Sequence, residues 1–271
     1  MSRKMLTVLI STYNDRIKLL DRVLNPHHKN IKYIVVHQVD NGEEYSNYTE
    51  KLTAEREDIR YFLSRTTGVT KSRNIALSQV DGDYALFMDD DVKLSADFYD
   101  TIQTSFEQYS KASVLTFRAG DMDTGEPLKD YLSEAQYHTK LSILKVGTIE
   151  VAFDVSAVKA TGVQFPEYLG AGTSLPTCDE PVFLARLMAK GHRLAFIPKT
   201  IVYHPRLSSG KEFVAENAFV CRGVAFKDIF GRFASIPVII LFYLKNRRKF
   251  QLKNQSALLA LFKGYLKTKF D

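Results

Sequence analysis

The sequence predicts an α/β fold with a mostly parallel central sheet, helices on both faces and a helical appendage at the C-terminus. Up to about residue 109, short apolar runs alternate with segments of helical periodicity, which is typical of a parallel sheet with helical crossovers. Three of these runs end in polar clusters, and the chain becomes apolar and basic after Lys211. We therefore expect two units, residues 1–210 and residues 211–271.

The first half of the chain reads as strand, helix, strand, helix, strand, helix and strand, with right-handed crossovers. Its expected strands are Leu6–Ile10, Tyr33–Val39, Ile59–Leu63 and Tyr84–Met88, and its expected helices are Arg16–Leu24, Thr49–Arg56 and Thr70–Gln79. Later strands are expected at Val114–Arg118, Val151–Val155, Leu194–Ile197 and Ile201–Tyr203, and later helices at Ala96–Tyr109, Ser156–Thr161 and from Asp179 to Gly191. Between them, Leu128–Leu144 is expected to hold a helix over the site, offering Tyr131, Tyr137, His138 and Lys140 to a ligand.

The amino-acid composition and net charge restrict the kinds of protein that this chain can be and the kinds of partner that it can bind. Of the 271 residues, 45% are apolar and 25% charged, as in an ordinary globular protein. The net charge of +6 suits an anionic partner, but no aromatic and basic module for nucleic acid is apparent. No signal peptide and no apolar run long enough to span a bilayer are expected, and two distant cysteines fit a reducing, cytoplasmic compartment.

An acidic run follows the apolar segment from Tyr84 to Met88. Asp89, Asp90 and Asp91 are consecutive, and such neighbouring carboxylates repel one another unless a cation offsets their charge. Ligands collect at the carboxyl ends of parallel strands, where these acids are expected. The run therefore indicates a magnesium or manganese site, with a solvated acidic turn as the alternative.

Two other strand ends and one helix start carry polar residues. Ser11–Asp15 and Asp40–Gly42 follow strands, and the carboxyl ends of parallel strands meet at one edge of a sheet. Gly68 precedes a helix whose first turn holds Lys71 and Arg73, which is unfavourable for the helix dipole unless an anion docks there. The alternative for this helix is an exposed basic face.

A second acidic pair, Asp179 and Glu180, follows a glycine-containing loop that includes Gly170 and Gly172. Acids at a helix start stabilise the dipole, which is the structural interpretation. The functional interpretation is a general base near the metal site. His204 closes an apolar strand and, together with two carboxylates, would complete a manganese site, although a lone histidine is more often structural.

The C-terminal unit contains an apolar stretch beside a basic cluster. Phe233–Leu244 is too short to span a bilayer and is followed by Lys245–Lys249, which contains four basic residues. This pattern is typical of an interfacial anchor on anionic lipid. Equally, it predicts helices that pack on the first unit or on another subunit of a homo-oligomer.

Four of these segments, in this order, resemble the family-2 glycosyltransferases, which are inverting sugar transferases with the GT-A nucleotide-diphospho-sugar transferase fold. The segments are Val8–Asn14, Val39–Gly42, Gly68–Asn74 and Leu86–Asp91, and the resemblance covers about residues 5–205. The later stretch from Leu169 to Pro205 is similar to bacterial members that build surface polysaccharides.

The resemblance implies a role for each candidate residue. A nucleotide-sugar donor, with a UDP-sugar favoured, would be bound by Ser11, Thr12, Tyr13, Asp40, Gly68, Lys71, Arg73 and Asp90. Asp89 and Asp91 would hold manganese or magnesium, with His204 as a third ligand, and Asp90 would turn away or contact the sugar. The family usually has Glu-Asp before the late helix. Here the order is Asp179-Glu180, which leaves open which acid is the base, and Asn41 replaces a usual aspartate.

The implied function is a one-step inverting transfer of a sugar to a hydroxyl of a glycan or lipid-linked acceptor, in bacterial surface polysaccharide synthesis. The enzyme would lie in the cytoplasm, on the inner face of the membrane if the C-terminal unit anchors it. Two other functions compete: a nucleotidyltransferase, which would release pyrophosphate, and a non-catalytic scaffold that binds nucleotide sugars without turnover.

Overall fold

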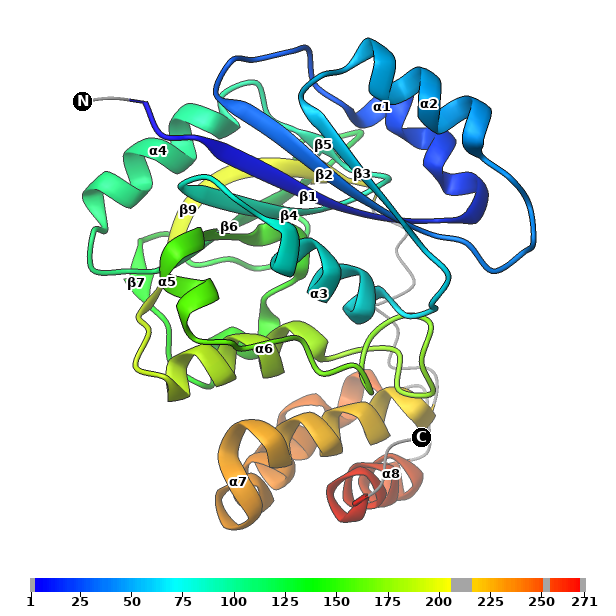
Figure 1. Cartoon of the computed structure of the whole chain (residues 1–271). Coiled ribbons are helices and arrows are strands. Elements are labelled where there is room, and N and C mark those ends of the chain that lie inside the picture. The colour runs from blue at the N-terminus through cyan, green and yellow to red at the C-terminus, as the bar shows by residue number, and fades with distance from the viewer. Residues whose placement is uncertain (1–2, 206–215, 251–253, 269–271) are drawn as a thin grey trace.

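The computed structural model describes residues 3–205, 216–250 and 254–268 (Figure 1). The first four strands form the parallel part of the sheet, in the order β3-β2-β1-β4. They are β1 (Leu6–Tyr13), β2 (Ile31–Gln38), β3 (Ile59–Ser64) and β4 (Tyr84–Asp89). The α/β class and these four strands are confirmed.

The second half of the sheet is mixed. Strand β8 (Val151–Asp154) is antiparallel to β4 and to β6 (Val114–Asp121), and β6 is parallel to β9 (Leu194–His204). The short strands β5 (Lys93–Leu94) and β7 (Gln136–Tyr137) both pair antiparallel with β9. Two separate strands were expected where β9 is continuous. Its register with β6 shifts over the stretch that contains Pro198, as at a β-bulge.

Helices cover both faces of the sheet (Figure 1). One face carries α1 (Leu20–Val23), which follows a 3-10 turn at Asn14–Leu19, together with α2 (Ser46–Glu55) and α4 (Phe98–Gln108). The other face carries α3 (Val69–Gln79), α5 (Val155–Ala160) and α6 (Asp179–Ala189). Alternate residues of β1 point to opposite faces, so Val8 and Ile10 enter one core cluster while Leu9 enters the other.

The expected helix at Leu128–Leu144 is not present, and this prediction was wrong. The segment contains β7 and a 3-10 turn at Ser142–Lys145 instead. The edge of β9 offers backbone partners, and side chains tie the segment down: the Tyr131 hydroxyl donates to Glu150, and His138 contacts the hydroxyls of Thr116 and Ser142. These side chains therefore hold the fold together, and Lys140 likewise donates to the carbonyl of Ile229.

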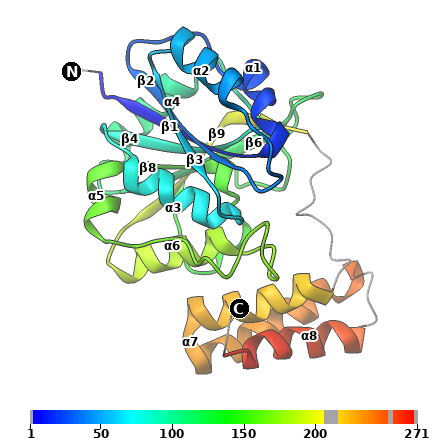
Figure 2. The same cartoon turned by 45° about the vertical axis from the view of Figure 1, so that its right-hand side comes forward.

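The C-terminal unit lies below α6 and contains α7 (Glu216–Asn246) and α8 (Asn254–Leu266) (Figures 1 and 2). Helix α7 is interrupted at Gly231, whose backbone is not helical, so it consists of two helical segments. The second segment continues through Pro237 and is followed by a 3-10 turn at Arg247–Lys249, and α8 packs along α7. The two helices touch backbone to backbone, because a Cβ on Gly223 would lie 2.0 Å from the carbonyl oxygen of Leu261. Within the described residues no helix has the length and apolar character to cross a bilayer. The expected boundary at residues 210 and 211 lies outside the described residues.

Candidate active site

The predicted polar clusters do meet at one edge of the sheet. Strands β1 and β4 are parallel neighbours, and their register places Ser11 opposite Asp89. Strand β2 lies on the other side of β1 and leads to Asp40. Helix α3 begins behind this edge, and the Ser72 hydroxyl contacts the Ser11 hydroxyl at 2.8 Å. The parallel sheet thus gathers residues from distant parts of the sequence, as expected for this topology.

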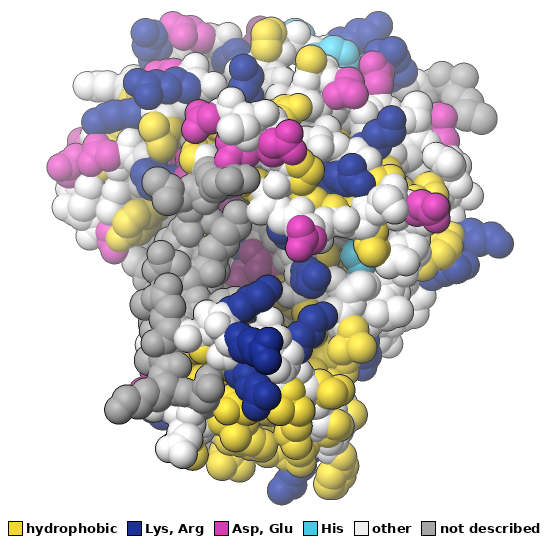
Figure 3. Space-filling model, turned by 180° about the vertical axis from the view of Figure 1, so that it is seen from behind, with side chains coloured by type: hydrophobic (Ala, Val, Ile, Leu, Met, Phe, Trp, Pro, Cys, Tyr) yellow, Lys and Arg dark blue, Asp and Glu magenta, His cyan; other side chains and the backbone are white. Residues whose placement is uncertain are grey.

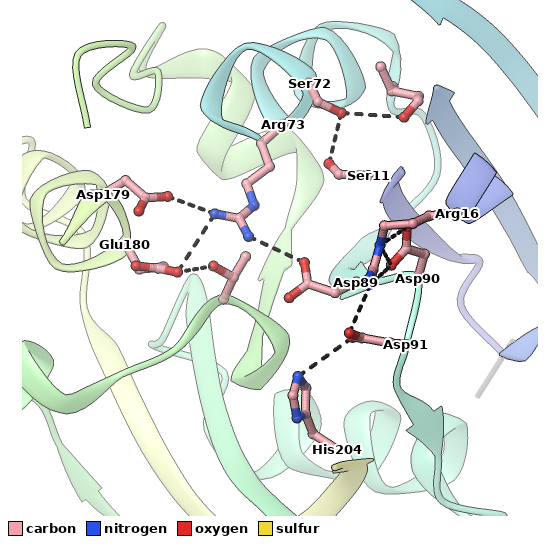
Figure 4. Close-up of polar contacts among 12 residues, drawn as sticks. Ser11, Arg16, Ser72, Arg73, Asp89, Asp90, Asp91, Asp179, Glu180 and His204 are labelled. Carbon is pink, nitrogen blue, oxygen red and sulfur yellow. Dashed lines mark hydrogen bonds and ion pairs between the residues drawn. The ribbon is translucent and has the colours of Figure 1, made fainter. Parts of the chain in front are cut away.

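Arg73 joins the two acidic groups into one site (Figure 4). Its guanidinium is buried and contacts Asp179 at 2.6 Å, Asp89 at 3.3 Å and Glu180 at 3.6 Å. Asp89 ends β4, whereas Asp179 and Glu180 open α6, ninety residues further along the chain. Three carboxylates this close together repel one another. The buried cation between them reduces that repulsion.

Asp179 and Glu180 differ in exposure although they are neighbours. The Asp179 side chain is 4% exposed and pairs with Arg73, while that of Glu180 is 21% exposed and accepts a hydrogen bond from the Thr148 hydroxyl. Burial and the nearby charge of Glu180 raise the pKa of Asp179, and the ion pair with Arg73 opposes that rise. Glu180 is therefore the acid of this pair that a ligand can reach.

The acidic run at the end of β4 divides in a similar way (Figure 4). Asp90 is buried, where it accepts a hydrogen bond of 2.7 Å from the Thr12 hydroxyl and contacts the Arg16 guanidinium. Asp91 is one-third exposed and accepts from Arg16 at 2.8 Å. Two arginines, Arg16 and Arg73, thus supply much of the positive charge that this run requires.

His204 and Asp91 form a pair with the chemistry of a metal site (Figure 4). The Nε2 atom of His204 lies 3.5 Å from Asp91 Oδ1, and its Nδ1 lies 2.6 Å from the carbonyl oxygen of Pro205. Because a carbonyl can only accept, Nδ1 carries the proton, and in the neutral ring the Nε2 lone pair faces the carboxylate. Two acceptors in this arrangement fit a cation between them, and imidazole and carboxylate are suitable donors for manganese or magnesium.

The expected three-residue metal set is only partly assembled. Asp89 points to Arg73 rather than to His204, so the pair that meets is Asp91 and His204. Across residues 3–205, 216–250 and 254–268, no three histidine, cysteine or acidic side chains form a group that could hold a metal ion. Any ion at Asp91 and His204 would therefore need ligands from a bound molecule or from water.

The expected nucleoside edge is present beside β1 and β2. The Tyr13 hydroxyl donates to Asp40 Oδ2 at 2.6 Å, and the Asn14 amide donates to Asp40 Oδ1 at 2.9 Å. These hydrogen bonds stabilise the charged form and lower the pKa of Asp40 below its usual value. Tyr13 is 41% exposed, which leaves its ring free to stack on a base.

The start of α3 is less open to an anion than the sequence suggested. The backbone N–H of Val69 donates to the carbonyl of Ala171, and Arg73 is directed to carboxylates. The two glycine loops pack tightly: a Cβ on Gly172 would lie 3.0 Å from the backbone of Gly68. Lys71, which is half-buried, remains as the basic side chain of this helix start that could meet a ligand.

Sequence reasoning missed three residues of this site: Arg16, Asn14 and Thr148. Asn14 belongs to the polar cluster at the end of β1, and Arg16 follows that cluster. Because the carboxyl ends of parallel strands meet, their position beside the acids could have been predicted. Thr148 carried no signal, because it belongs to a 3-10 turn whose approach to Glu180 depends on the tertiary fold.

Comparisons with known proteins identify a family for the first half of the chain. The family model described as "Glycosyl transferase family 2" matches residues 7–159, which is more than half of the chain. No match was found among curated proteins. The matched region includes the acidic run and Arg73, whereas Asp179, Glu180 and His204 lie beyond it.

Solved structures similar to the chain include residues 1–349 of TarS from S. aureus. The complex with UDP has a TM-score of 0.66 and 17% sequence identity, covering 97% of this chain and 81% of that one. The complex with UDP-GlcNAc has a TM-score of 0.61 and 16% identity, covering 96% and 71%. At this identity the likeness concerns the fold, which is the GT-A fold expected from the sequence. With the family match, it follows that the chain belongs to glycosyl transferase family 2.

Proposed function

We propose that the chain transfers a sugar from a nucleoside diphosphate sugar to a hydroxyl group, in one displacement that inverts the anomeric centre. One observation carries this proposal: Arg73 joins the acids at the end of β4 to those at the start of α6. A single displacement needs a base for the acceptor and a charge-neutralising site for the leaving group, close to each other. The acids at the start of α6 would supply the base, and the acid run at the end of β4 would supply a ligand for the cation that neutralises the leaving group.

Glu180 is the proposed general base. It is the more exposed acid of its pair, and the Thr148 hydroxyl fixes one of its oxygens. Its carboxylate would take the proton from the acceptor hydroxyl, while that oxygen attacks the anomeric carbon and the bond to the diphosphate breaks. Asp179 would hold Arg73 in place, since it is buried in the shortest ion pair of the cluster.

Asp91 and His204 are the proposed ligands of a divalent cation, and the diphosphate would complete its coordination. When bound, such a cation neutralises the charge that develops on the leaving diphosphate. Arg16 would orient Asp91, because its guanidinium bridges Asp90 and Asp91. Asp90 itself would be a positioning residue, since Thr12 and Arg16 occupy its carboxylate.

The donor is proposed to be a UDP-sugar. The Tyr13–Asp40 pair offers a ring for stacking and a charged acceptor for the hydroxyls or imide of a nucleoside. The similar TarS structures contain UDP and UDP-GlcNAc, which supports the same choice here. The acceptor is proposed to be a glycan or a lipid-linked glycan.

A product assay tests this proposal against its rivals. The purified chain, with manganese and a panel of nucleotide sugars, should be stabilised against heat by its donor, and with a glycan acceptor added it should release a nucleoside diphosphate. Release of pyrophosphate in a parallel assay that supplies a nucleoside triphosphate and a sugar phosphate would instead identify a nucleotidyltransferase. Stabilisation without any turnover, across donors and acceptors, would favour a binding scaffold.

A further inference from the structure

The second half of α7 carries an apolar stripe on its outer face. Phe233, Pro237, Ile240, Leu241 and Leu244 recur at a spacing of four, three, one and three residues, which places them on one side of a helix. Phe233 is 83% exposed, Leu241 65% and Leu244 51%. Single exposed apolar residues are common, but a continuous stripe of large ones indicates a contact surface.

The opposite side of the same helix already packs on the protein. Ile239 is fully buried, and Val238, Phe242 and Tyr243 pack against the core that the C-terminal helices share with α6. Between Phe233 and Leu244 the chain has no charged residue. Only one side of this helix is buried against the protein. Burial within the chain therefore does not explain why the outer side is also apolar.

Basic residues border this stripe at both ends. Arg232 precedes it, and Lys245, Arg247, Arg248 and Lys249 follow it; all five are exposed. In Figure 3, hydrophobic side chains gather over the C-terminal helices, next to a group of lysine and arginine side chains. We name Phe233–Lys249, with its apolar stripe and its terminal cations, the α7 surface.

Charge in this chain is unevenly distributed. Residues 229–270 contain nine lysines and arginines and no acid, while the whole chain has a net charge of +6. The remainder of the chain is therefore slightly acidic. Such an asymmetry indicates a partner with a negative surface for the C-terminal unit alone.

We propose that the α7 surface lies in the plane of an anionic lipid bilayer. The stripe is about 18 Å long at the helical rise, too short to cross a hydrocarbon core of about 30 Å. Its large apolar side chains would enter the acyl boundary, while the cations at its ends would meet the phosphate headgroups.

Two other partners fit less well. In a two-fold contact, the α7 surface of one copy would lie against the α7 surface of the other. Residues 229–270 contain no acid, so the cations of the two copies would face each other without carboxylate partners. Nucleic acid would use the cations but not the exposed apolar stripe, which would remain in water. A bilayer with anionic headgroups satisfies both parts of the surface.

The arrangement has a consequence for the candidate site. Helix α7 packs against α6, and α6 begins at Asp179 and Glu180. Docking of the α7 surface would hold the unit that carries these acids beside the bilayer through its C-terminal helices. This suits an acceptor carried on a lipid, although membrane binding itself does not depend on the proposed transferase activity.

Co-sedimentation of the full chain with vesicles tests the proposal. Vesicles of phosphatidylcholine with phosphatidylglycerol should bind the protein, and phosphatidylcholine alone should bind it much less. Replacing Phe233, Leu241 and Leu244 with serine should weaken binding on the order of a hundredfold. Replacing Lys245, Arg247 and Arg248 with glutamine should weaken it similarly and should remove the dependence on phosphatidylglycerol.

Matched controls come from the first unit. Leu132→Ser with Leu141→Ser removes two other exposed apolar side chains, and Lys29→Gln with Lys32→Gln removes two exposed cations. Both control variants should bind vesicles as the unaltered chain does, and thermal unfolding should show that every variant is folded. Because the altered side chains are exposed, folding should be retained.

Failure of the unaltered chain to bind anionic vesicles would overturn the proposal. So would equal binding by the serine variant and the unaltered chain. If light scattering instead found an oligomer that the serine variant dissociates, with no vesicle binding, the α7 surface would be a contact between copies. Donor turnover can be measured on the same samples without vesicles, so loss of this proposal would leave the proposed function untouched.

Discussion

The two acidic groups of the candidate site are arranged in a similar way, although one follows a strand and the other begins a helix. Asp89–Asp91 ends a strand and is held by two arginines, whereas Asp179 and Glu180 open a helix and share Arg73. In each group one acid is buried against an arginine: Asp90 against Arg16 and Asp179 against Arg73. The other acids are more exposed, namely Asp89 and Asp91 in the first group and Glu180 in the second. Within each group, burial thus separates a carboxylate that is held inside the protein from carboxylates that solvent can reach.

Replacing Glu180 with glutamine gives the largest expected effect. Without a base, the rate at saturating donor and acceptor should fall by about 10²–10⁴-fold, while donor affinity should change little. Single-turnover transfer and donor titration would measure the two quantities separately. The matched variant is Asp179→Asn, which should lose less activity per folded molecule; a larger loss there would reverse the assignment of the base.

Replacing Arg73 with glutamine should destabilise the fold by about 3–5 kcal/mol, because three carboxylates lose a buried cation. Urea unfolding would measure this loss. Arg16→Gln is the control, since Arg16 is half-exposed and water can replace part of its contact with Asp90 and Asp91. If the two variants lost the same free energy of unfolding, burial of the arginine would not determine its contribution to stability.

Replacing Asp91 with asparagine should weaken manganese binding on the order of a hundredfold, because a charged ligand is lost. Calorimetric titration of manganese in the presence of UDP would report it. Asp90→Asn provides the comparison, since the Asp90 carboxylate is turned inward to Thr12 and Arg16. If the two variants bound manganese equally, Asp91 would not be a ligand.

The last prediction concerns the pH dependence of stability. The pKa of Asp179 is raised in the folded protein, to about 7, above its value near 3.9 in the unfolded chain. The folded state then holds a proton that the unfolded state has lost. The contribution of Asp179 to the free energy of unfolding should therefore decline as pH rises between these two pKa values, by on the order of 1 kcal/mol per pH unit.

Unfolding in urea from pH 4 to pH 8 would detect this decline. The Asp179→Asn variant should show a shallower loss of stability with rising pH than the unaltered chain. An identical slope in both proteins would mean that Asp179 titrates as an ordinary carboxyl. The Arg73 ion pair would then determine its charge, and burial would not.

The strands and the strand-end clusters could be predicted because local pattern determines them. The run from Tyr84 to Met88 has no charge before Asp89, and parallel strands bring such ends to one edge. The contact of Arg73 with Asp179 could not be predicted, since it joins residues 106 positions apart. Leu128–Leu144 was mispredicted because the exposed edge of β9 and the buried Glu150 determine its course, and neither is visible in its own periodicity.

The proposed reaction is a single displacement at the anomeric carbon, with Glu180 as base and no covalent intermediate. Proton NMR of the first-formed product from an α-linked UDP-sugar would reveal its anomeric configuration. We expect a β-configured product, with UDP released in equal amount and with formation strongly reduced in the Glu180→Gln variant. An α-configured product, or unchanged formation in that variant, would contradict it.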